Sequence, residues 1–164
     1  MRRFWITAVA TFGLDQVSKL AVVHGLDLIN RGEFDVLPPF LVFRMAWNRG
    51  INFGLFGGAP DAARWILIGV ALAISVWVIW WIRSERDNWK AQLAGGLLVG
   101  GALGNVIDRI VYGAVADFLN MSCCGIENPY AFNVADIAIF VGAIGLVLFA
   151  GNAPKDGKPA GKPR

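Results

Sequence analysis

Four long apolar segments limit what this chain can fold into. They run from about Phe4 to Val23, from Ala62 to Ile82, from Ala91 to about Tyr112, and over residues 133–151. Each approaches the ~20 residues that a helix needs to cross a hydrocarbon core of about 30 Å. A mean hydropathy of +0.55 and a 56% share of hydrophobic residues are rare in soluble domains. The sequence therefore predicts an all-α membrane protein, a bundle of four transmembrane helices that forms one domain over residues 1–152.

Lysine and arginine residues indicate how the bundle lies in the membrane. With a cytoplasmic N-terminus, nine of the 15 fall on the inner side and four on the outer side. Because cytoplasmic loops carry the excess of positive charge, we expect both chain ends to be cytoplasmic. Residues 153–164, rich in Pro, Gly and Lys, are expected to form a disordered cytoplasmic tail.

Charge and metal-ligand content exclude other classes of function. The formal net charge of +3 is too small to indicate nucleic-acid binding. One His and two neighbouring cysteines, Cys123 and Cys124, cannot build a His/Cys metal cluster. A disulfide between neighbours is strained, so the two cysteines are interpreted as loop packing or reduced thiols. We expect no metal, no cofactor and a monomer.

Two segments are expected on the outer side of the membrane. The first runs from about His24 to Asp61. In it Phe34 and Val36 alternate with the acidic residues Glu33 and Asp35, and a β-prone run from Phe40 to Trp47 follows. This pattern predicts a small β element, a short strand pair at the membrane surface, followed by a Gly-rich loop. The second, about Gly113 to Phe132, is expected to be a loop that carries Asp117.

Polar residues of the spans lie at or above mid-depth, on the outer side. A rise of about 1.5 Å per residue places Asp15 and Lys19 roughly 17 and 22 Å above the inner end of the first span. The same rise places Asn105 and Arg109 high in the third span, and Asp136 about 5 Å below the outer end of the fourth. Ionisable residues within a membrane mark functional sites by default. We therefore expect a site that opens to the outer leaflet.

Several of these residues have structural interpretations as well. Asp15 and Lys19 are spaced i,i+4, which favours a mutually neutralising pair that braces the bundle over direct chemistry. Three glycines spaced by four form a smooth face for helix packing: Gly96, Gly100 and Gly104. Asn105, Asp108 and Arg109 lie just above this face, and they fit substrate contact and a scaffold equally well.

Asp117 and Asp136 have no obvious cationic partner close in sequence, and both fall near the outer boundary. If the segment between them folds back, the two carboxylates face each other, and such a pair shares one proton. The pair would then supply a base that activates water and an acid that protonates a leaving group. Two unrelated acids explain the spacing equally well.

Five short motifs follow one another in order along the four spans. They are DQVSK (15–19), NRGINFG (48–54), GGALGNVIDR (100–109), GAVADF (113–118) and FNVAD (132–136). Together, over residues 5–150, they resemble the lipoprotein signal peptidase (signal peptidase II) family of bacteria. The sequence departs from the family pattern at Ile51-Asn52, where small residues are common. The resemblance implies an aspartic endopeptidase of the inner membrane that cuts diacylglyceryl-modified prolipoproteins just before the lipidated cysteine.

The resemblance also implies roles for individual residues. The catalytic aspartates of the family fall on Asp117 and Asp136. Substrate-binding or supporting roles fall on seven further residues: Asp15, Lys19, Asn48, Gly50, Asn105, Arg109 and Asn133. The two aspartates would hold one proton between them and activate a water without a metal. The outer loop of residues 34–60 would close over the lipidated cysteine as a lid.

Two other functions stay open at this point. A small ion- or proton-coupled carrier would use Asp15, Lys19, Asp108 and Asp136 as a relay. The lack of internal repeats and the clustering on the outer side argue against a carrier. A non-enzymatic scaffold would use the glycine face as a dimer seam, and it would tolerate the loss of either Asp117 or Asp136.

Overall fold

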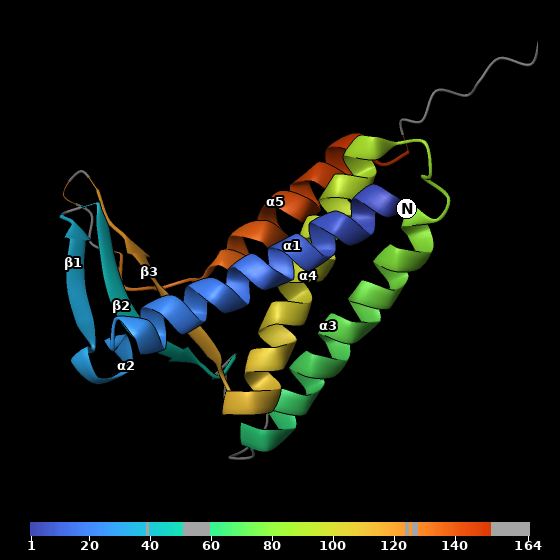
Figure 1. Ribbon diagram of the computed structural model, residues 1–164. Coiled ribbons are helices and arrows are strands. Elements are labelled where there is room, and N and C mark those ends of the chain that lie inside the picture. The colour runs from blue at the N-terminus through green and yellow to red at the C-terminus, as the bar shows by residue number, and fades with distance from the viewer. Residues whose placement is uncertain (39, 51–59, 124, 126–127, 152–164) are drawn as a thin grey trace, which may run out of the picture.

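The computed structural model describes residues 1–38, 40–50, 60–123, 125 and 128–151. Four helices form a bundle: α1 (Arg2–Lys19), α3 (Pro60–Ile82), α4 (Trp89–Tyr112) and α5 (Val134–Phe149). A three-stranded sheet lies across one end of the bundle (Figure 1): β1 (Glu33–Leu37), β2 (Leu41–Asn48) and β3 (Val115–Met121). A π-helical segment, Leu20–Gly25, extends α1 towards the short helix α2 (Leu28–Arg31).

Three helices within the described residues are long and apolar enough to cross a membrane. They are Arg2–Gly25, which is α1 with its π-helical extension, Ala62–Ile82 and Trp89–Tyr112. The fourth, α5, is apolar but has 16 residues. The predicted positions of the four apolar helices are thus confirmed, and three of the four have the length that the prediction requires.

Helix α4 is the centre of the bundle. In the most apolar 18-residue stretch of α4, 67% is buried inside the protein, whereas the buried share is 28% for α1 with its extension and 22% for α3. The predicted packing role of the glycine face is confirmed, because an added Cβ at Gly96 would meet the backbone of Phe4, and one at Gly100 would meet the backbone of Ala8. This close approach brings the polar side chains of α1 and α4 within contact distance further along the two helices.

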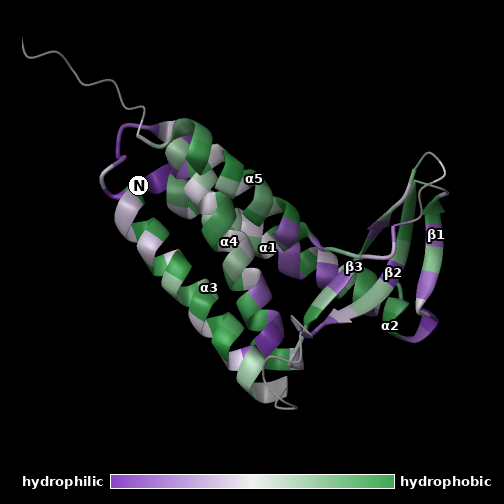
Figure 2. Cartoon of the chain, turned by 180° about the vertical axis from the view of Figure 1, so that it is seen from behind, coloured by the Kyte–Doolittle hydropathy of each residue, from purple (hydrophilic) through white to green (hydrophobic). Residues whose placement is uncertain are grey.

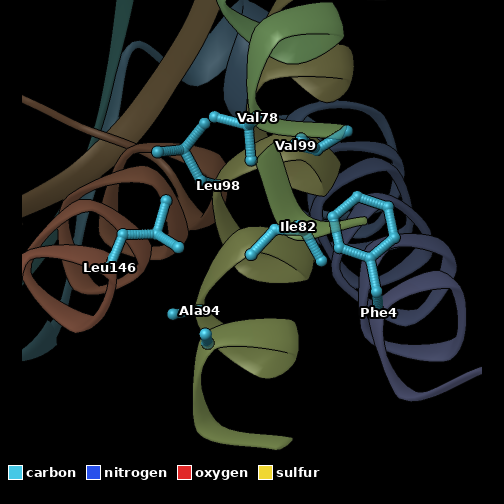
Figure 3. Close-up of a cluster of buried hydrophobic side chains, with 8 residues drawn as sticks. Phe4, Val78, Ile82, Ala94, Leu98, Val99 and Leu146 are labelled. Carbon is cyan, nitrogen blue, oxygen red and sulfur yellow. The ribbon is translucent and has the colours of Figure 1, made fainter. Parts of the chain in front are cut away.

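Apolar side chains close the half of the bundle that lies away from the sheet. All four long helices contribute to this cluster (Figure 3), which includes Phe4, Val78, Ile82, Ala94, Leu98, Val99 and Leu146. Because lipid tails are as apolar as these side chains, close packing rather than the hydrophobic effect holds the helices together here.

A second apolar cluster joins the sheet to Leu20–Gly25, the π-helical extension of α1. Val22, Val23 and Phe118 are buried in it, and Phe34 and Phe43 pack against them. The ring of Phe43 meets Phe34 and Phe118 edge to face, with centroids 5.4 and 5.8 Å apart. The predicted strand pair is confirmed as β1 and β2, which pair antiparallel.

The prediction of a loop between α4 and α5 is wrong over Val115–Met121, because this stretch forms β3. It pairs antiparallel with β2 and is buried at nearly every residue. A strand buried on both faces lacks the alternation of apolar and polar residues that identifies a half-exposed strand. Residues 51–59 and the predicted tail lie outside the described residues.

Candidate active site

The first turn of α5 holds Asp136 by a reciprocal pair of hydrogen bonds. Asn133, the N-cap residue, accepts the backbone N–H of Asp136 on its side-chain oxygen at 3.0 Å. Asp136 Oδ2 accepts the backbone N–H of Asn133 in return at 3.2 Å. This capping box satisfies two backbone donors of the helix end, and the N-terminal turn of a helix is a favourable place for a carboxylate. The side chain of Asp136 is therefore held in place by the N-terminal turn of α5.

Asp117 lies in β3 and is almost fully buried. Asn133 donates its side-chain N–H to Asp117 Oδ1 at 2.6 Å, and Asn48, at the end of β2, donates to Oδ2 at 3.1 Å. Burial, and after it the negative charge of Asp136, raises the pKa of the Asp117 carboxyl to about 7, although the hydrogen bonds from Asn48 and Asn133 act to lower it. Asp117 is thus a carboxyl group that can hold or release a proton near neutrality.

Asn133 and Asn105 connect the two aspartates. Asn133 contacts both of them, because its side chain caps α5 at Asp136 and donates to Asp117. Asn105 of α4 donates to Asp136 Oδ1 at 2.9 Å and accepts a further N–H of Asn133 at 3.3 Å. Two carboxylates bridged by amides, one of them with a pKa near neutrality, form an arrangement that suits the activation of water.

Lys19 is the centre of a buried ion cluster next to this pair. Its ammonium group lies 2.7 Å from Asp15 Oδ2 and 2.7 Å from Asp108 Oδ2. Gln16 donates to both carboxylates at 3.1 Å. The predicted neutralising pair of Asp15 and Lys19 is confirmed. Lys19 also forms an ion pair with a second carboxylate, that of Asp108 on α4. The cluster therefore ties α1 to α4.

The same two carboxylates of the ion cluster hold the backbone beside the catalytic candidates. Asp108 Oδ2 accepts the N–H of Ala116 at 3.2 Å, one residue before Asp117. Asp15 Oδ1 accepts the N–H of Ala135 at 3.0 Å, one residue before Asp136. The strand that carries Asp117 and the helix that carries Asp136 are thus each held by a hydrogen bond to a buried carboxylate.

Arg109 and Gly50 lie at the edge of this arrangement. The guanidinium of Arg109 donates to the backbone oxygen of Asn105 at 3.2 Å and is within electrostatic range of Asp136 and Asp117. Its Nε is buried and has no hydrogen-bond partner among the described residues. Gly50 has a φ of +94° and lies against the side chain of Leu67 on α3, so a larger residue would be strained and would clash there.

The structure gathers all nine residues singled out from the sequence at the sheet end of the bundle. All nine belong to one hydrogen-bonded network, together with Asp108 and Gln16: Asp15, Lys19, Asn48, Gly50, Asn105, Arg109, Asp117, Asn133 and Asp136. The sequence left the role of Asp108 open and gave none to Gln16. The signal for Gln16 was its place between Asp15 and Lys19 in DQVSK, on a helix face that meets α4.

A family comparison agrees with this geometry. A model of the signal peptidase (SPase) II family matches residues 7–151. The chain belongs to the signal peptidase II family. A lipoprotein signal peptidase of Methylorubrum extorquens (strain PA1) is 45% identical over 143 residues, which cover 87% of this chain and 82% of that protein. Another, from Rhodopseudomonas palustris (strain ATCC BAA-98 / CGA009), is 40% identical over 146 residues and covers 87% of both chains.

Solved structures share the arrangement of this signal peptidase II family member. Two structures described as bacterial membrane enzymes have TM-scores of 0.74 and 0.76, with sequence identities of 28% and 27%. The similarity covers 90% of this chain and 87% and 92% of theirs. Membership of a peptidase family confirms the predicted enzyme class and does not favour the carrier.

Proposed function

We propose that this chain is a membrane-embedded aspartic endopeptidase that removes the signal peptides of diacylglyceryl-modified prolipoproteins by cutting just before the lipidated cysteine. One observation carries the proposal: Asn133 holds Asp117 at 2.6 Å while it caps the helix turn that carries Asp136. This bridge is what an aspartate pair that shares a proton needs. The names of the relatives, lipoprotein signal peptidases, support the substrate class.

In the proposed mechanism, Asp117 and Asp136 hold one proton between them and position a water molecule. Because its pKa is raised to about 7, Asp117 keeps the proton near neutrality. Asp136 takes a proton from the water as it attacks the scissile carbonyl, and Asp117 gives its proton to the departing amine. The unpaired Nε–H of Arg109 stabilises the oxygen of the tetrahedral intermediate.

The remaining site residues support the pair. Asn48, Asn105 and Asn133 orient the two carboxylates, and Asp15 holds the backbone of Ala135 while Lys19 neutralises its charge. Gly50 lets the chain pass close to α3. The active form is proposed to be a monomer. Residues 1–152 are proposed to form one peptidase domain.

The bundle is proposed to cross the bacterial inner membrane four times, with α5 as the fourth span. Both termini lie in the cytoplasm, and the sheet and the aspartate pair lie toward the outer leaflet. The distribution of Lys and Arg supports this orientation. The site residues lie at the sheet end of the bundle, away from the N-terminus of α1 (Figure 1). A lipidated substrate that diffuses in the outer leaflet would reach a site at this depth.

The test is cleavage of a diacylglyceryl-modified prolipoprotein peptide by purified protein in detergent, with EDTA present throughout. Wild type is compared with Asp117→Asn and Asp136→Asn. We expect wild type to cut before the cysteine, and each variant to lose at least ~10³-fold in rate while it melts at a similar temperature. Normal cleavage by either variant would show that the acids are structural. An inactive wild type on the lipidated peptide would overturn the proposed substrate.

A further inference from the structure

Helix α3 supplies none of the residues of the hydrogen-bonded network described above, yet its first turns contact segments that lead to the site. The helix packs chiefly on α4, and Figure 1 shows its start next to the end of α4, where the chain turns into β3. Figure 2 shows that α3 is mostly hydrophobic, whereas hydrophilic residues gather on the half of α4 nearer the sheet. Arg64, near the start of α3, is a charged and half-buried residue of this apolar helix.

Arg64 caps the end of α4. Its guanidinium donates to the backbone oxygen of Ile110 at 2.9 Å. Ile110 lies in the last turn of α4, and the last four C=O groups of an α-helix have no partner within the helix. The helix ends at Gly113, which has a φ of +77°. Arg64 Nη1 lies 3.8 Å from the place that a Cβ would take at Gly113. The guanidinium therefore contacts both the last turn and the residue at which the helix ends.

Two further features concern the guanidinium of Arg64. It lies over the ring of its neighbour Trp65, 5.2 Å from the ring centroid, in a cation–π contact. Its Nε is buried and has no hydrogen-bond partner among the described residues. A buried donor without a partner is unfavourable, so the bond to Ile110 is made although it leaves this Nε unpaired. These contacts place the guanidinium at the end of α4 rather than in solvent.

The turn that Arg64 contacts separates two groups of the candidate active site. Arg109 lies four residues before Gly113, and Asp117 lies four residues after it, in β3. The unpaired Nε–H of Arg109 is the donor proposed for the tetrahedral oxygen. A shift of the last turn of α4 would therefore displace a donor and a carboxyl group that act on the same substrate carbonyl, and rates are sensitive to small displacements of this kind.

A second residue of α3 contacts the other segment that leads to Asp117. Leu67, three residues after Arg64 and on the same side of the helix, lies against Gly50. Gly50 donates its N–H to Asn48 Oδ1 at 2.9 Å, and Asn48 donates to Asp117. This contact of Leu67 is apolar and has no directional bond. The start of α3 thus contacts both segments that lead to Asp117, and the directional contact is that of Arg64.

We propose that Arg64 is a positioning residue of the peptidase. By holding the carbonyl of Ile110, it fixes the last turn of α4, and so the place from which Arg109 reaches the substrate and the point at which the chain enters β3. Lysine could supply one donor to Ile110, but not the planar group that also covers Gly113. The inference rests on the proposed function.

Steady-state cleavage of lipidated peptide in detergent tests this role with Arg64→Gln and the milder Arg64→Lys. We expect kcat to fall about tenfold or more in Arg64→Gln and less in Arg64→Lys, with KM nearly unchanged in both. Arg44→Gln removes an exposed arginine of β2 that pairs with Glu33, and as the matched control it should keep the wild-type kcat. A wild-type kcat in Arg64→Gln, or a loss that appears in KM alone, would overturn the positioning role.

A double-variant cycle with Arg109→Lys distinguishes positioning from a general loss of stability. Arg64→Lys keeps the charge and is the variant used in the cycle. If Arg64 acts through Arg109, Arg64→Lys lowers kcat by a clearly smaller factor in the Arg109→Lys background than in wild type. Equal factors in the two backgrounds would show that Arg64 does not act through Arg109, and would overturn the proposal.

Hydrogen exchange measures the turn itself, without substrate. In a peptide that covers residues 110–118, we expect exchange at least about tenfold faster in Arg64→Gln than in wild type, and unchanged exchange in Arg44→Gln. Unchanged exchange in Arg64→Gln would overturn the proposal even if kcat falls. An inactive wild type would refute the proposed function, and the exchange experiment would still decide whether Arg64 holds the turn.

Discussion

Asp108 accepts the backbone N–H of Ala116, the residue that precedes Asp117. Asp15 does the same for Ala135, the residue that precedes Asp136. Lys19 lies 2.7 Å from both accepting carboxylates. One buried cation therefore neutralises two carboxylates that hold the backbone on either side of the aspartate pair. The geometry of the pair depends on a cluster that has no direct part in the chemistry.

Asp108 should act as a positioning residue. Asp108→Asn keeps an oxygen that can accept the N–H of Ala116, whereas Asp108→Ala leaves that buried N–H without a partner. We expect kcat to fall about tenfold or more in Asp108→Ala and less in Asp108→Asn, with KM nearly unchanged in both. Steady-state cleavage of lipidated peptide in detergent measures this split. Ser75→Ala, in a buried residue of α3 whose hydroxyl donates to the backbone oxygen of Ala71 in the same helix, is the control. Equal kcat values for the Asn and Ala variants would contradict the positioning role.

The loss of Lys19 should destabilise the fold more than the loss of a carboxylate does. Lys19→Met leaves Asp15 and Asp108 buried without their shared cation, which costs about 3–5 kcal/mol. We expect a clear drop in melting temperature, measured in one detergent by tryptophan fluorescence. Adding Asp108→Asn should restore part of the loss, since one unpaired charge is removed. Lys90→Met, at an exposed lysine that lies over the rings of Trp89 and Phe149, should melt close to wild type. A double variant that melts below Lys19→Met would refute the shared-cation interpretation.

The positions of the long helices could be predicted from the sequence because lipid requires runs of about 20 apolar residues. The Gly96, Gly100 and Gly104 face was predictable for a similar reason, since close helix contact in a membrane favours small residues at regular spacing. β3 was not predictable, because its burial on both faces removes the alternation of a surface strand. The resemblance to a known family, not the spacing of residues, selected Asp117 and Asp136 as a pair.

The role of Asp108 shows what the sequence could not supply. An acid three residues after Asn105 predicts a shared helix face but not which partner that face meets. The partner depends on how α1 packs against α4, and on the backbone of β3, whose existence was missed. Asn133 was assigned a supporting role from a motif. Its double role as helix cap and Asp117 partner required the path of the chain between β3 and α5.

The pH dependence of cleavage should report the proton on Asp117. The mechanism needs this carboxyl protonated, and its pKa is raised to about 7 by burial and by Asp136. The protonated fraction is complete well below pH 7 and is lost as pH rises through the pKa, so kcat/KM should fall on the alkaline side of about pH 7.

The pH at which kcat/KM falls, the alkaline limb of the profile, should depend on Asn48. Its hydrogen bond to Asp117 lowers the pKa of that carboxyl, so Asn48→Ala should move the limb to higher pH. Asn30→Ala, at an exposed asparagine that bonds Asp27, should leave the limb in place. The prediction is checked by measuring kcat/KM as a function of pH for wild type, Asn48→Ala and Asn30→Ala. A limb that moves to lower pH in Asn48→Ala would mean that the titrating group is not Asp117.

Two glycine-to-alanine substitutions should distinguish the contribution of helix packing to stability from the contribution of helix propensity. An added Cβ at Gly100 of α4 would meet the backbone oxygen of Ala8 and the side chain of Thr11, so Gly100→Ala should push α1 away and cost about 1–3 kcal/mol. At Gly13 of α1 nothing lies within 4 Å of an added Cβ. Gly13→Ala should therefore keep or raise stability by up to about 1 kcal/mol, since alanine is the better helix former.

Activity should follow the same order as stability, with Gly100→Ala below Gly13→Ala. Gly100 lies between the apolar end of the bundle and the contact of Lys19 with Asp108, so a shift of α1 there loosens the backbone at Ala116 and Ala135. We expect Gly100→Ala to lower both the melting temperature and kcat, and Gly13→Ala to lower neither. If the two variants melt alike, close packing of α1 on the glycine face does not hold the site together. If Gly100→Ala loses stability but keeps full kcat, the ion cluster positions the aspartate pair without help from this helix contact.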